Sequence, residues 1–160
     1  MFSMLFFVAS ILLTVSASAI PMKRDETCTP NARGDTVQFA SDFDGRKITI
    51  GETHIYRLEQ DGNFPSNFLL KSPTDWSQTA TIVDDKLEFG SVSSSGANDD
   101  QLFEVDCNIC DANGFSLSVA SGCMVKSKAS GLCLDASDFT FSDCNRADAF
   151  HRYSVDKRTE

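Results

Sequence analysis

Short apolar runs separated by turn-prone residues fill most of this chain. The clearest case is the stretch 123–155, where Ser, Gly, Asp and Asn separate four runs: Cys123–Val125, Leu132–Leu134, Phe139–Phe141 and Tyr153–Val155. Runs of this length between turn residues are typical of β-strands. No window beyond the apolar start of the chain shows helical periodicity, so we predict an all-β protein of about a dozen short strands.

Three stretches share one pattern: a polar residue, a spacer, an aromatic, a charged or polar residue and an aliphatic. They are His54–Leu58, Gln101–Val105 and His151–Val155, spaced by 47 and 50 residues. The aromatic and aliphatic members are two apart, so on a strand they point to one face. Three such units would have to share a core, and we predict a β-trefoil of three four-stranded repeats, roughly 12 strands, over residues 25–156. A β-sandwich with chance similarity is the alternative.

A second similarity supports the repeat. Phe68–Ser72 and Cys123–Ser127 each consist of three apolar residues followed by Lys-Ser, and we expect them to open the second and third units. Further strands are expected at Val37–Phe39, Ile48–Ile50, Thr79–Val83 and Leu87–Phe89. The stretch 106–122 falls outside the repeat, and its Asn-Gly pair at 113–114 predicts an inserted hairpin.

The chain begins with an apolar run from Met4 to Val15 that ends at Ala17-Ser18-Ala19. This layout predicts a secretory signal peptide over residues 1–19, because the run is too short to span a bilayer. An N-terminal core helix is the alternative. The basic pair Lys23-Arg24 makes 20–24 either a short propeptide or an ordinary frayed end. Residues 157–160, which start with a second basic pair, are expected to form a C-terminal tail.

Net charge and cysteine content restrict the classes of binding partner and the cellular compartment that we expect. The full chain has a net charge of −9, and removal of Lys23 and Arg24 with the leader leaves 12 basic against 23 acidic side chains, or −11. A surface this acidic repels phosphate groups, so we expect no nucleic-acid and no membrane partner, and a monomer. Six cysteines, all after the leader, predict three disulfides in a secreted, extracellular protein, with fifteen connectivities open.

The third unit resembles the ricin-B type lectin repeat. The resemblance lies in Gly131-Leu132-Cys133-Leu134-Asp135, in Cys144 as the second cysteine, and in His151-Arg152-Tyr153 where the family has Gln-x-Trp. Gln101-Leu102-Phe103 is closer to that last motif. The match is good over 123–155, fair over 68–105 and weak before that. The chain is also similar to small secreted fungal proteins with this domain.

The resemblance implies a sugar site. Asp135 matches the family residue that holds two sugar hydroxyls, Phe141 is the expected stacking aromatic, and His151 replaces the family Gln. Phe150 occupies the position of the family Asn, so one polar ligand is missing. The alternative is that Asp135 caps a turn and Phe141 packs in the core.

The resemblance also pairs Cys133 with Cys144. For the remaining cysteines we expect Cys110 with Cys123 and Cys28 with Cys107, without a motif to support either pair. The spacing of Cys107 and Cys110 could indicate a redox pair or half a zinc site. The chain lacks the helix that a redox motif opens and the second close pair that zinc needs, so we expect no metal.

Together these features predict a secreted, non-enzymatic module that binds an extracellular glycan or glycoprotein and needs no cofactor. An enzyme is not expected, because no catalytic constellation appears and both histidines, His54 and His151, occupy equivalent positions of the repeat. Two alternatives stay open. One is a protein-binding trefoil of the protease-inhibitor kind, and the other is a structural or host-interaction protein.

Overall fold

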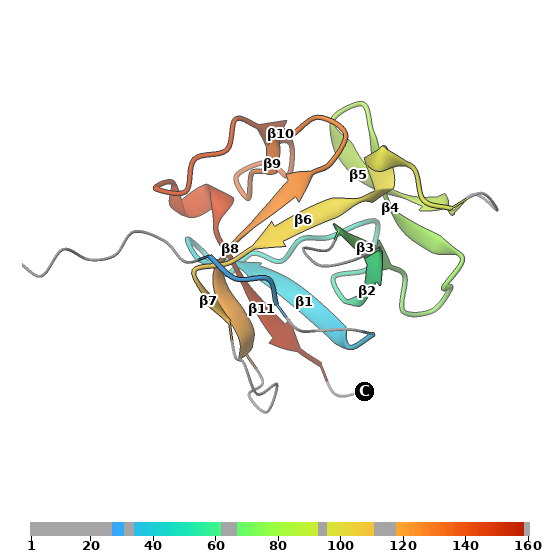
Figure 1. Cartoon of the computed structure of the whole chain (residues 1–160), viewed down its shortest axis with the longest axis horizontal. Helices are drawn as coiled ribbons and strands as arrows, with labels where there is room; N and C mark the ends of the chain where they lie inside the picture. Colours follow the sequence, from blue (N-terminus) through green and yellow to red (C-terminus); the bar gives the residue numbers. More distant parts are fainter. Residues whose placement is uncertain (1–26, 31–33, 62–66, 93–95, 111–117, 159–160) are drawn as a thin grey trace, which may run out of the picture.

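Six antiparallel strands close into a barrel in the computed structural model of the chain (Figure 1). Each pairs with the next, and the last returns to the first. They are β1 (Thr36–Ser41), β2 (Tyr56–Asp61), β3 (Asn67–Lys71), β6 (Phe103–Asp106), β8 (Ser118–Ser127) and β11 (Tyr153–Lys157). Closure leaves no free edge within the barrel itself.

The structure describes residues 27–30, 34–61, 67–92, 96–110 and 118–158. The predicted signal peptide and propeptide lie outside these ranges, as does the Asn-Gly turn at 113–114.

Further elements surround the barrel. The described strands outside it are β4 (Gln78–Val83), β5 (Lys86–Ser91), β7 (Ile109–Cys110), β9 (Cys133–Leu134) and β10 (Phe141–Ser142). Two single 3-10 turns, η1 (Asp99–Gln101) and η2 (Ala149–His151), precede β6 and β11, and the described residues contain no α-helix. The prediction of an all-β chain is therefore confirmed.

The barrel encloses one core, which the alternation along each strand explains. On β2, Tyr56 and Leu58 are fully buried, while Arg57 and Glu59, which follow each of them, are only partly covered. The aromatic and aliphatic members of all three repeated stretches belong to the same buried cluster: Tyr56, Leu58, Phe103, Val105, Tyr153 and Val155. The period-2 pattern therefore identified three of the six barrel strands and the face that each buries.

The prediction of a β-trefoil with three equivalent four-stranded repeats is wrong. The strands outside the barrel do not form three matching pairs: β4 and β5 make a six-residue hairpin, β9 and β10 pair over two residues, and β7 adds to β8. Between β1 and β2 only the isolated bridges Ala40–Lys47 and Ile50–Thr53 form. The repeat in the sequence reflects similar barrel strands, not similar connections.

Two local predictions can be compared directly. The extra hairpin expected within 106–122 is confirmed where the chain is described, since Ile109 pairs with Ser121 and Cys110 with Ala120. The tail begins later than expected. Lys157 is still the last residue of β11, and the Arg158 N–H donates to the Thr36 carbonyl at 2.8 Å.

Candidate functional site

Asp135, the first predicted sugar ligand, lies in the loop that follows β9. The loop is closed by its backbone, because the Asp135 N–H donates to the Thr140 carbonyl and the Phe139 N–H to the Asp135 carbonyl, both at 2.8 Å. The carboxylate Oδ1 accepts the Ser137 N–H at 2.7 Å. The side chain is 20% exposed, so Asp135 caps its own loop and leaves little of its carboxylate to solvent.

His151, the second predicted ligand, is buried at the end of η2. Its Nε2 lies 2.8 Å from the Ser142 hydroxyl, and its Nδ1 accepts the Asn145 N–H at 3.3 Å. A backbone N–H can only donate, so Nδ1 is the acceptor in this contact and Nε2 is the ring nitrogen left to face the Ser142 hydroxyl. His151 thereby ties the loop after β10 to η2.

Asp135, His151 and Ser142 form a cluster with the residue types of a serine hydrolase, but with a different geometry. Asp135 Oδ2 lies 3.5 Å from His151 Nε2, the same nitrogen that contacts Ser142. A catalytic relay needs the carboxylate on one ring nitrogen and the hydroxyl on the other. The second nitrogen here accepts a backbone N–H, so this cluster has no free base for the hydroxyl.

Phe141, the expected stacking aromatic, is part of the core. It is 8% exposed, lies opposite Leu134 in the β9–β10 pair, and stacks on Phe103 with ring centroids 6.4 Å apart. The ring therefore has almost no face to offer a ligand, and its packing holds β10 against the barrel. Of the three predicted ligands, Asp135 and His151 lie together, while Phe141 faces away from them into the core.

Other aromatic rings gather beside the Asp135 loop. Phe43, in the connection after β1, is 58% exposed, and its ring centroid lies 4.2 Å from that of Phe150 in η2. The Phe150 carbonyl accepts the Ala136 N–H at 2.9 Å, so η2 and the Asp135 loop are joined directly. The connection is held in place by the Asp42 N–H, which donates to the Arg152 carbonyl at 2.9 Å.

Arg46 links the same connection to the Asp135 loop. Its guanidinium donates to the Ser137 carbonyl at 3.0 Å and lies 5.8 Å from the ring centroid of Phe139. It also pairs with Asp44, whose Oδ1 accepts the Arg46 N–H at 3.0 Å; this backbone hydrogen bond holds the pKa of the Asp44 carboxyl below its ordinary value. Arg46 and Asp44 therefore place charged groups at the border of the Phe43 and Phe139 rings.

We call this surface the Phe43 face, defined by Phe43, Phe150, Phe139, Arg46 and the exposed part of Asp135. Sequence reasoning identified only Asp135 among these residues. Phe43 lies between two acidic residues and before a glycine, a composition that is typical of a turn and carries no information on whether the ring is exposed. Phe150 stood out only as a departure from the family pattern.

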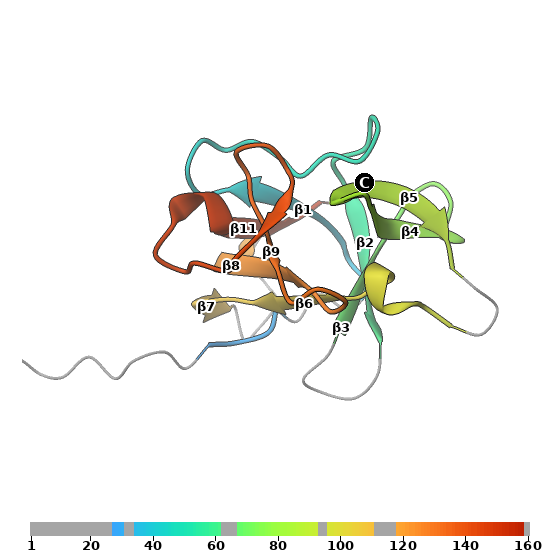
Figure 2. The same cartoon turned by 90° about the horizontal axis from the view of Figure 1, so that it is seen from above.

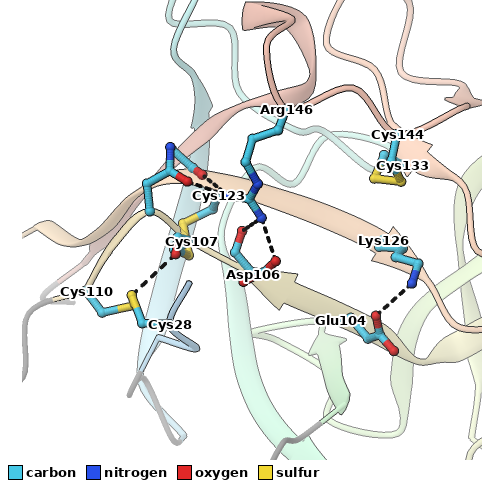
Figure 3. A network of polar contacts seen from close by, with 12 residues as sticks. Cys28, Glu104, Asp106, Cys107, Cys110, Cys123, Lys126, Cys133, Cys144 and Arg146 are labelled. Atoms are coloured by element: carbon cyan, nitrogen blue, oxygen red, sulfur yellow. Dashed lines mark hydrogen bonds and ion pairs between the residues drawn. A yellow bond between two sulfur atoms is a disulfide. The ribbon is translucent and has the colours of Figure 1, made fainter. Parts of the chain in front are cut away.

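Three disulfides join the described elements: two lie around Cys107 and Cys110, and one links β9 to the segment after β10 (Figure 3). All six cysteines are oxidised, and the predicted pair Cys133–Cys144 is confirmed. The other two predicted pairs are wrong, because the bonds are Cys28–Cys110 and Cys107–Cys123. Asp106 pairs with Met124 in the β6–β8 ladder, so Cys107 and Cys123 are the next residues directly opposite each other.

A charged clamp closes the neighbouring loop, also shown in Figure 3. Arg146 lies two residues after Cys144, and its guanidinium reaches the Asp106 carboxylate and the Asn108 side-chain oxygen, each at 2.5 Å. The clamp fixes the segment between β10 and η2, which also supplies the Asn145 N–H to His151.

No protein-family model matches the chain, and no curated protein shows significant sequence similarity to it. Within the ranges that the structure describes, no helix is long and apolar enough to cross a membrane, and no group of three or more acidic, His or Cys side chains is placed to hold a metal ion.

Proposed function

We propose that this chain is a secreted, non-enzymatic protein that binds a glycan through the Phe43 face. The observation that carries the proposal is the exposed Phe43 ring beside the partly buried Phe150. Phe43 keeps 58% of its surface in solvent although its ring contacts that of Phe150 in a tilted arrangement, with the centroids 4.2 Å apart. An aromatic surface bordered by a few fixed polar groups suits the apolar C–H face of a sugar and its surrounding hydroxyls.

The polar border supplies the second half of such recognition. Arg46 offers hydrogen-bond donors, while Asp44 and the exposed part of the Asp135 carboxylate offer acceptors. Arg46 and Asp135 are already held by Ser137, at 3.0 Å and 2.7 Å respectively, so little side-chain freedom is lost when a ligand binds. Three disulfides support an oxidising compartment and hence the extracellular setting where glycans are displayed.

The test is a glycan panel probed with the oxidised protein and with Phe43→Ala. The exposed ring can be removed without opening the core, so this variant should fold normally and lose at least about tenfold in affinity, as expected when a central aromatic contact is deleted. Val83→Ala is the matched control, since Val83 is another exposed apolar side chain, at 42%, in the β4–β5 hairpin. It should bind like the wild type.

Circular dichroism on each variant separates loss of binding from loss of fold. If the wild type binds no glycan on the panel, the proposed function is wrong. If it binds and Phe43→Ala binds equally well, the glycan site lies elsewhere on the protein.

A further inference from the structure

A second aromatic side chain is presented to solvent far from the Phe43 face. Trp76, the single tryptophan of the chain, lies in the connection between β3 and β4 and is 59% exposed. The β4–β5 hairpin that follows it and η2, which carries Phe150, lie at opposite sides of the molecule in both Figure 1 and Figure 2. The two aromatic surfaces are therefore separate.

The connection that carries Trp76 is held by its own hydrogen bonds. Asp75 Oδ1 accepts the Ser77 N–H at 3.0 Å and the Ser77 hydroxyl at 2.6 Å, which lowers the pKa of the Asp75 carboxyl. The Gln78 N–H donates to the Asp75 carbonyl at 3.0 Å, and the Asp75 N–H donates to the Ser72 hydroxyl at 3.3 Å. Trp76 is thus held outward by a formed turn.

A guanidinium lies against the indole. The Arg57 side chain projects from the outer face of β2, and its Cζ is 4.2 Å from the centroid of the Trp76 ring. Gly34 leaves room for it, because a Cβ at that position would lie 3.2 Å from Arg57 Nη2. The Gly34 N–H donates to the Leu58 carbonyl at 2.7 Å, so the close approach is part of the fold.

This guanidinium differs from its neighbours in its partners. Lys71 pairs with Glu59 at 2.8 Å and Lys157 with Asp35 at 2.7 Å, whereas Arg57 has no ion pair and no side-chain hydrogen bond with any residue that the structure describes. Contact with the ring occupies the face of a guanidinium and leaves the N–H donors at its edge unused. In a chain with net charge −9, the Arg57 guanidinium thus lies beside an exposed indole without a carboxylate partner among the described residues.

We infer that Trp76 and Arg57 form a second binding site, specific for a sugar that carries a carboxylate. The indole suits the C–H face of a pyranose ring, and the guanidinium edge can take a carboxylate in a two-point hydrogen-bonded pair. A neutral sugar would use the ring alone. This site is independent of the Phe43 face, so the chain would hold two glycan segments of different charge at once.

The experiment uses the fluorescence of Trp76, which reports this site alone because the chain has no other tryptophan. The oxidised protein is titrated with an oligogalacturonate, with its carboxyl-reduced neutral counterpart and with an oligoglutamate of similar charge. We expect a saturable change with the oligogalacturonate and at least about tenfold weaker binding of the neutral sugar, the effect of losing a charged hydrogen-bonded pair. Added salt should weaken binding of the oligogalacturonate and leave binding of the neutral sugar unchanged.

Arg57→Gln should weaken binding of the oligogalacturonate at least about tenfold. Arg57→Lys keeps the charge but lacks the planar pair of N–H donors, so it should weaken binding by a smaller factor. Phe43→Ala should leave the Trp76 fluorescence titration unchanged. A failure of the Trp76 site and a failure of the Phe43 face would therefore be seen in different experiments. The lysine variant tests the inference if the glutamine variant does not fold. Equal response to the neutral sugar, equal response to oligoglutamate, or no response to oligogalacturonate would overturn it.

Discussion

The backbones of Cys28 and Cys107 pair with each other, yet their sulfur atoms do not. The Cys28 N–H donates to the Cys107 carbonyl at 2.9 Å and the Cys107 N–H returns a bond of 2.8 Å. Cys107 turns its fully buried side chain into the core and bonds to Cys123, which leaves Cys28 to bond with Cys110. Backbone pairing and covalent pairing thus hold the N-terminal segment to two different residues of one hairpin.

Peptide mapping of the unreduced protein can confirm this arrangement. Ile109 is 67% exposed between Cys107 and Cys110. Thermolysin cleavage before it, combined with cleavage between Cys110 and Cys123 and between Cys28 and Cys107, should separate a Cys107–Cys123 fragment from a Cys28–Cys110 fragment. Recovery of Cys28 linked to Cys107 would contradict the structure.

Removal of the Cys28–Cys110 disulfide should lower the stability of the fold strongly. Cys28 and Cys110 are 82 residues apart, and the loop-closure model gives a loss of about 4.5 kcal/mol of unfolding free energy for the double Ser variant. Urea denaturation measures this directly. The Cys133→Ser/Cys144→Ser variant, with a separation of 11 residues, should lose less, about 3 kcal/mol.

The Arg146 clamp should contribute measurably to stability. Arg146 is 23% exposed and Asp106 44%, so solvent screens the pair only in part. We expect Arg146→Ala to lower the unfolding free energy by about 1 kcal/mol, and a double-mutant cycle with Asp106→Asn to show coupling. Lys126→Ala is the control, because its pair with Glu104 is more exposed, at 40% and 50%, and should contribute close to nothing. Equal losses in the two variants would show that the clamp is an ordinary surface pair.

The two tyrosines should make the protein sensitive to alkali. Burial raises the pKa of Tyr56 and of Tyr153 well above the ordinary value of 10.0. The folded state therefore keeps both protons at a pH where the unfolded state releases them, so stability is complete below about pH 10 and falls as pH rises toward the folded-state pKa. Each tyrosine should remove about 1.4 kcal/mol per pH unit in that window.

Phenolate absorbance reports only these residues, because the chain has no other tyrosine. It should rise together with the loss of circular dichroism, in one cooperative step. The Tyr56→Phe variant should show half the pH dependence. Gradual ionisation near pH 10 in a folded protein would mean that the rings are accessible to water.

Substitutions at Phe141 test whether its ring packs in the core or contacts a ligand. Phe141→Ala should cost about 3–5 kcal/mol of unfolding free energy because it empties a buried ring position, and Phe141→Leu should cost much less. Thermal unfolding of both variants provides the comparison. A stable Phe141→Ala protein that has lost only glycan binding would return Phe141 to the role of a stacking aromatic.

Local patterns in the sequence were enough to locate several elements. The alternation around Leu87 and Phe89 predicted β5, and Asp84 and Asp85 both adopt positive φ, 49° and 60°, in the tight turn that joins it to β4. The one disulfide supported by a motif, Cys133–Cys144, was also predicted correctly. Each of these features depends on residues close together in the chain.

Features that depend on distant residues were not predictable. Phe139 and Phe141 are two apart and would share one face of a strand, but Phe139 has a φ of 59° and leaves the strand to lie beside Arg46. A positive φ at a phenylalanine is held by the surrounding structure and has no sequence signature. Phe43 and Phe150 come from opposite ends of the chain, so only barrel closure brings their rings together.

Barrel closure also sets the order in which the chain can fold. Val37 to Ser41 in β1 pair with Tyr153 to Lys157 in β11. The β1–β11 pairing can therefore form only after the last strand has been synthesised and has left the ribosome. Until then β1 carries an unpaired edge, the kind of surface on which nascent chains aggregate. The Cys107–Cys123 and Cys133–Cys144 bonds join residues that emerge before β11, so oxidation can cross-link the C-terminal half of the barrel while its seam is still open.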